Sequence, residues 1–141
     1  MDATDQKLLS LLRTDCRTNV ATLAQKLGVS RGTVSNRIAR LEDAGVIVGY
    51  TVRLRPDAQP NEIKASMGIA VQGNEARLVI ASLLGEPGVA TLHGTNGRWD
   101  LLAELRAQNL AELAQVLERI RLIKGISNTE TSIHLETYRL S

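Results

Sequence analysis

Apolar residues recur every three or four positions through the first 44 residues, a period that predicts amphipathic helices. Three short helices are expected, at residues 5–14, 20–27 and 31–44. A residue type that favours helix N-caps precedes each one: Thr4, Asn19 and Ser30. Glycines follow the second and third helices, as is typical of helix ends.

The next segment, residues 46–54, is rich in β-branched side chains and predicts a strand or a short hairpin. With Arg53 and Arg55 it would form a basic wing beside the helices. Residues 55–62 contain two prolines and no period, so we expect a linker there. The predicted N-terminal domain therefore spans residues 1–54.

The remaining residues, 63–141, alternate between strand and helix patterns. Strands and helices are expected in the order βαββαβ, at residues 63–71, 74–84, 89–95, 98–106, 110–124 and 128–138. Asn96 and Gly97 lie between two of these strands and form a strong hairpin signal. Leu110, Leu113, Leu117 and Ile120 are expected to form the buried face of the second helix.

This order is that of the ferredoxin-like domain, whose antiparallel sheet carries both helices on one face. The other face, with Ser66, Gly68, Ala70 and Leu102, has no cover within one chain. A bare sheet face of this kind favours a homodimer packed sheet to sheet. The predicted class is α+β: a winged helix-turn-helix domain followed by a ferredoxin-like βαββαβ domain.

Composition narrows the class of protein. Aromatic residues make up 2% of the chain, so the core must be aliphatic. Cys16 is the single cysteine, which excludes an internal disulfide, and we expect it to be a small buried residue. No apolar run approaches the roughly 20 residues of a membrane span. The acidic N-terminus lacks the basic region of a signal peptide, so a cytoplasmic, nucleoid-associated location is expected.

Positive charge is concentrated in the first part of the chain. Residues 1–60 hold nine Lys and Arg against six Asp and Glu, whereas residues 61–141 hold eight against nine. A basic first domain is expected if that domain meets an anion such as DNA. A solvated basic face is the alternative explanation.

Residues 20–44 have the spacing of a helix-turn-helix, with a three-residue turn at 28–30. A recognition helix presents its first two turns to base edges in the major groove. Arg pairs with guanine and Asn with adenine, while short hydroxyls and helix N-termini hold phosphates. The candidate DNA contacts are Ser30, Arg31, Thr33, Asn36, Arg37 and Arg40. A plain three-helix bundle is the alternative.

Several short motifs occur at characteristic positions: LA at 23–24, GVS at 28–30, RI at 37–38, LE at 41–42, GVI at 45–47, GYT at 49–51 and GRWD at 97–100. In these motifs the chain resembles the Lrp/AsnC family of transcription regulators over nearly its whole length. The resemblance implies a second domain that dimerises through its sheet. It also implies assembly of dimers into octamers and binding of small effectors, usually amino acids, at subunit interfaces.

The resemblance further implies an effector site around the Gly-x-x-Asp signature. Its candidate residues are Asn96, Gly97, Arg98, Asp100, Thr129 and Thr131. Asp100 would accept from the ligand's ammonium, while backbone N–H groups near Gly97 and the two threonine hydroxyls would hold its carboxylate. Arg98 would select an acidic ligand side chain or pair with a neighbouring acid. Strand alternation predicts Trp99 on the core side of the sheet and Asp100 on the open side.

The resulting hypothesis is a sequence-specific transcription regulator that binds double-stranded DNA and responds to an amino acid. One alternative is a nucleoid-type architectural protein without an effector. Another is an enzyme on the same scaffold, similar to haem-pathway decarboxylases. His93 and His134 are too sparse for a metal site, and no catalytic or cofactor motif occurs, so neither an enzyme nor a cofactor is expected.

Overall fold

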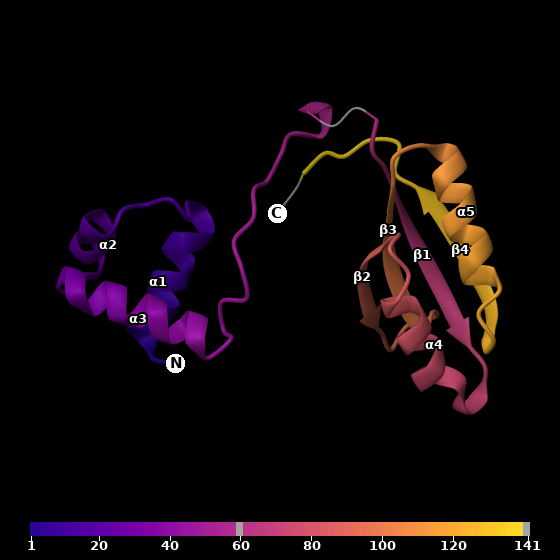
Figure 1. The fold of residues 1–141 in the computed structure, drawn as a ribbon, viewed down its shortest axis with the longest axis horizontal. Coiled ribbons are helices and arrows are strands. Elements are labelled where there is room, and N and C mark those ends of the chain that lie inside the picture. Colours follow the sequence, from indigo (N-terminus) through magenta and orange to yellow (C-terminus); the bar gives the residue numbers. More distant parts are fainter. Residues whose placement is uncertain (59–60, 140–141) are drawn as a thin grey trace. The chain divides into compact units, whose positions relative to one another are not determined.

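The computed structural model describes residues 1–58 and 61–139. The chain divides into two compact units, residues 1–52 and 53–141, with elements labelled in Figure 1. The expected linker at 55–62 holds a short 3-10 helix, Pro56–Ala58, and its residues 59 and 60 lie outside the described part. Of the described helices, none is long and apolar enough to cross a bilayer.

The N-terminal unit contains three helices, α1 (Ala3–Thr14), α2 (Val20–Leu27) and α3 (Arg31–Asp43). Apolar side chains from all three meet in one small core: Leu8, Leu12, Leu23, Ala24, Val34 and Leu41. The expected caps of the second and third helices are confirmed, because the Asn19 and Ser30 side chains accept from Thr22 and Thr33 N–H.

Two expectations for α1 and the turn that follows it were wrong. The N-cap of α1 is Asp2 rather than Thr4, because Asp2 and Asp5 satisfy each other's backbone N–H groups in a capping box. Cys16 is exposed, since it lies in the turn after α1 rather than on the helix face that meets the core.

Residues 46–54 form no strand, so the expected wing with Arg53 and Arg55 is absent. The segment has β-branched side chains, but no strand in the described part of the chain pairs with it. Most of its apolar side chains are exposed, Val48 to 94%, and only Ile47 packs partly against the helical core. β-Propensity acts through cross-strand neighbours, and without them it does not define a strand.

The C-terminal unit has the predicted ferredoxin-like topology, and the α+β class is confirmed. Its elements are β1 (Ile63–Val71), α4 (Ala76–Leu84), β2 (Val89–Gly94), β3 (Leu101–Ala107), α5 (Leu110–Arg121) and β4 (Ile126–Ile133). The four strands are antiparallel in the order β2-β3-β1-β4. Figure 1 shows α4 and α5 on the same side of this sheet.

The core of this unit lies between the sheet and the two helices. Alternate residues of β1 and β3 meet Val79 and Leu83 of α4 and Leu113, Val116 and Ile120 of α5. Leu110 was expected in the buried face but is 61% exposed, since it is the first residue of α5 and lies beyond the sheet contact.

The strand limits also differ from the expected ones. β3 begins at Leu101, not at residue 98, because residues 95–100 form an irregular loop held by internal hydrogen bonds. β4 covers Ile126–Ile133 rather than residues 128–138, and its last residue, Ile133, lies opposite Ala65 of β1.

Candidate functional site

Helix α3 carries the predicted DNA-reading residues, and the turn before it fixes where they begin. Gly28 has a left-handed backbone (φ 68°) that ends α2 and lets the chain reverse within three residues. The Ser30 hydroxyl then accepts from Thr33 N–H at 3.1 Å and lies 2.9 Å from its hydroxyl. Two short polar groups therefore lie at the helix N-terminus, where an anion is favoured.

The other candidates on α3 differ in their exposure and in their contacts with the rest of the unit. Arg31, Asn36 and Arg40 are exposed, and in the described ranges neither of these two arginines forms an ion pair. Arg37 instead points back at α1. Its side chain is 22% exposed and binds the carboxylates of Asp2 and Asp5 at 2.7 and 2.9 Å.

In the second unit, the loop before β3 places Asp100 against the end of β1. The Asp100 carboxylate accepts from Val71 N–H at 2.8 Å, and its backbone oxygen accepts from Thr95 N–H. The Thr95 hydroxyl donates to Trp99 oxygen at 2.6 Å and accepts from Gly97 N–H. The loop thus has a defined shape, although it is not a strand.

A cavity of about 460 Å³ lies between this loop and α4. Its walls comprise Val71, Gly73, Ala76, Ile80, Gly94, Thr95, Asn96, Asp100 and Leu101. Four of these are branched or small apolar side chains, and three present polar side-chain atoms. Such a mixture is typical of small-molecule sites, which are mainly apolar with a few polar groups that orient the ligand.

The structure brings together part of the predicted effector set. Asn96 and Asp100 line the cavity, and Gly97 is adjacent in the same loop. Thr129 and Thr131 do not line it, since they lie on β4, the edge strand beyond β1, whereas the cavity lies at the loop between β2 and β3. Thr95 and the Val71 N–H were missed, because the first looks like a strand residue and the second is backbone.

Trp99 was expected on the core side, and that prediction was wrong. Its ring lies over Gly68, where an added Cβ would approach the ring to 2.6 Å. Gly68 is opposite Leu102, on the face of the sheet that the helices leave open. The Arg98 guanidinium lies 5.2 Å from the Trp99 ring centroid. The alternation argument failed because residues 98–100 are not part of β3.

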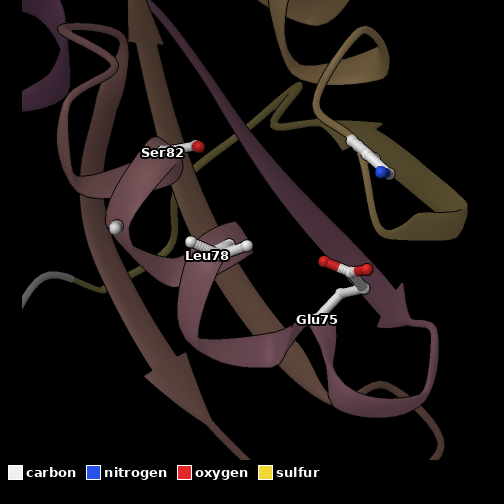
Figure 2. Close-up of a pocket in the computed structure, with 5 residues that line it drawn as sticks. Glu75, Leu78 and Ser82 are labelled. Carbon is white, nitrogen blue, oxygen red and sulfur yellow. The ribbon is translucent and has the colours of Figure 1, made fainter.

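A second groove, of about 580 Å³, opens on the outer side of α4 (Figure 2). Glu75, Leu78, Ala81, Ser82 and Lys124 line it, and nothing in the sequence predicted it. Leu78 is 65% exposed, so the groove is a shallow surface feature. Within residues 1–58 and 61–139, no three His, Cys, Asp or Glu side chains are grouped as metal ligands would be.

Comparison with known proteins shows a family match for each of the two units. The AsnC-type helix-turn-helix domain matches residues 1–42, and the Lrp/AsnC ligand binding domain matches residues 64–141. A protein of Pyrococcus abyssi, named as an uncharacterized HTH-type transcriptional regulator, is 34% identical over 149 residues, which cover 99% of this chain and 95% of that one.

Solved structures agree with this placement. Escherichia coli AsnC has a TM-score of 0.83 at 26% identity, over 100% of this chain and 96% of its own. The feast or famine regulatory protein of M. tuberculosis, complexed with L-methionine, has a TM-score of 0.82 at 27% identity, over 99% and 95%. The chain therefore belongs to the Lrp/AsnC family and is a DNA-binding transcriptional regulator.

Proposed function

We propose that this regulator binds specific DNA sequences through α3 and responds to an uncharged, aliphatic α-amino acid bound beside the loop at residues 95–100. The observation that carries the proposal is the cavity in which Asp100, fixed by Val71 N–H, lies beside apolar walls. The feast or famine regulatory protein of M. tuberculosis, which was solved with L-methionine, supports an amino acid as the class of ligand.

The chemistry of the cavity favours this class. One Asp100 oxygen accepts from Val71 N–H, which leaves the other oxygen to accept from a ligand ammonium. Thr95 and Asn96 add polar groups, while Val71, Ile80 and Leu101 would contact an aliphatic side chain. Its volume of about 460 Å³ lies within the usual range for small ligands.

Arg98 argues against an acidic ligand. It was a candidate for selecting a ligand carboxylate, but its guanidinium lies over the Trp99 ring and it does not line the cavity. Among the described residues that line the cavity, Asp100 is the only charged one. We therefore expect aspartate and glutamate to bind less well than valine, leucine, isoleucine or methionine.

A second subunit would complete the site. The open sheet face carries Leu102, 44% exposed, together with Gly68 under the Trp99 ring. We propose that two copies pack these faces together and that the dimers assemble further, up to an octamer. Binding that favours one arrangement of subunits would change the spacing of the DNA-reading helices.

Thermal shift measurements against the twenty amino acids test the effector. A ligand that binds only the folded chain raises the melting temperature by mass action. Asp100→Asn should abolish the shift, because it keeps an oxygen for Val71 N–H but removes the charge. Lys124→Ala, in the α4 groove, is the matched control and should keep the shift. A shift that survives Asp100→Asn and disappears in Lys124→Ala would place the effector in that groove instead.

Selection of genomic fragments by the full chain tests the choice of DNA. Arg31→Ala combined with Arg40→Ala should abolish binding to the selected fragments, because both side chains are exposed on α3. A regulator that binds genomic DNA in this way would act in the cytoplasm, at the nucleoid. Equal affinity for selected and random DNA would favour an architectural role instead.

A further inference from the structure

Arg37 lies on the recognition helix but is held inside the N-terminal unit. A single nitrogen, Nη1, donates to both oxygens of Asp2, at 2.8 and 2.7 Å, and to Asp5 Oδ1 at 2.9 Å. Both acids belong to the start of α1, more than 30 positions away in the sequence. The contact therefore joins two helices that no other ion pair in the described residues of this unit connects.

The two carboxylates are themselves fixed by the backbone. Asp5 N–H donates to Asp2 at 2.9 Å, and Asp2 N–H donates to Asp5 at 3.4 Å. The hydrogen bond from Arg37 holds the pKa of the Asp2 carboxyl below its usual range. Arg37 thus meets a pair of carboxyl groups already held in place by the backbone rather than two mobile side chains.

This environment is poorly suited to contact with DNA. A phosphate brought to Arg37 would have to displace or approach two carboxylates, and like charges at that distance repel. Within residues 1–58 and 61–139, Arg31 and Arg40 on the same helix form no ion pair with an acid. The arginines of α3 are therefore of two kinds: Arg37 is bound by two carboxylates, whereas Arg31 and Arg40 are exposed.

We propose that Arg37 is a positioning residue for DNA binding, which fixes α3 against the N-terminus of α1 through Asp2 and Asp5 and makes no contact with DNA. The inference rests on the proposed use of α3 as the reading helix. It removes Arg37 from the set of candidate DNA contacts and adds Asp2 and Asp5 to the residues on which DNA binding depends.

The contact through one nitrogen gives a specific test. A lysine ammonium has three donors on one nitrogen and can replace Nη1, whereas it cannot replace an arginine that pairs with guanine through two nitrogens. Affinity of the full chain for a labelled duplex DNA of mixed sequence is measured against salt concentration. Each phosphate contact contributes about 0.9 to the slope of log affinity on log salt.

Arg37→Met should weaken binding several-fold with an unchanged salt slope, and should lower the melting temperature. Arg37→Lys should restore both affinity and melting temperature. Asp5→Asn, which keeps an oxygen for Asp2 N–H, should weaken binding in the same direction as Arg37→Met. Arg31→Gln is the control for a direct contact and should lower the slope by about one for each bound domain.

Three results would overturn the inference. A salt slope lowered by Arg37→Met would mean a phosphate contact, and failure of Arg37→Lys to restore binding in a stably folded chain would mean base reading. Tighter binding by Asp5→Asn would mean that the acids restrain Arg37 from DNA. If Arg31→Gln and Arg40→Gln leave both the affinity and the salt slope unchanged, the reading role of α3 fails as well, which distinguishes the two failures.

Discussion

Glu86 is a buried acid, 9% exposed, in the turn between α4 and β2. It accepts from Gly88 N–H at 3.1 Å and from two nitrogens of Arg119 on α5, at 2.9 and 2.7 Å. Neither composition nor periodicity predicted this contact, because it joins residues 33 positions apart. Individual charges in this chain are thus used for structure as well as for binding.

Replacement of this acid should destabilise the second unit. Glu86→Gln removes the charge and turns an amide nitrogen toward the guanidinium, so we expect a loss of about 2 kcal/mol. Urea denaturation followed by circular dichroism measures it. Glu118→Gln removes an exposed partner of Arg121 at 3.6 Å and should change stability little. Equal losses for the two variants would contradict this role.

The same contact predicts a dependence on pH. The hydrogen bonds from Arg119 hold the pKa of the Glu86 carboxyl below its usual value of 4.5, against the opposing effect of burial. A depressed folded-state pKa contributes stability above the unfolded value, and this stability is lost as pH falls through the folded one. The difference in unfolding free energy between wild type and Glu86→Gln should therefore shrink below about pH 4.5. A constant difference across acid pH would refute this explanation.

Gly68 offers a further test at the level of one residue. An added Cβ would lie 2.6 Å from the Trp99 ring, so Gly68→Ala must displace the only tryptophan of the chain. We expect red-shifted, more readily quenched fluorescence and a loss of about 1–3 kcal/mol. Gly94→Ala, at a position with nothing within 4 Å, is the control. An unchanged spectrum in Gly68→Ala would mean that Trp99 does not cover this face.

Among the elements, helices were predicted more accurately than strands. The turn at 28–30 and the caps of α2 and α3 are local, so sequence alone defines them. Segment 46–54 and residues 98–100 have strand-like composition, but neither has a strand partner in the described chain. A strand depends on its neighbours, whereas a helix satisfies its own backbone.

Variants of the α3 cap can distinguish an effect on folding from an effect on DNA binding. Ser30→Ala loses the acceptor for Thr33 N–H and should cost about 1 kcal/mol. Ser30→Asp keeps the cap but adds a negative charge where we expect a phosphate, so stability should persist while DNA affinity falls. Ser30→Asn, a neutral cap, should keep both. Undiminished DNA affinity in Ser30→Asp, measured by fluorescence anisotropy, would remove this helix end from the interface.

For the whole molecule, the open sheet face is the surface through which we propose that two copies assemble. Both helices cover the other side, and Leu102 remains 44% exposed at the centre of the open side. Leu102→Glu should convert the proposed dimer into monomers in size-exclusion chromatography with light scattering, because a buried unpaired charge is costly. Leu110→Glu, which replaces the same residue type at a more exposed site on α5, should leave the dimer intact. A Leu102→Glu dimer would mean that another surface joins the subunits.

The sequence by itself determined the three helices, the order of the second unit and the family, because helical period, caps and turn motifs are local. Only the tertiary structure decided that Arg37 and Glu86 form ion pairs, that Trp99 covers Gly68, and that Thr129 and Thr131 lie away from Asp100. The reason is physical: periodicity shows on which face of its helix or strand a side chain lies. The partner of that side chain depends on which distant segment the fold brings beside it.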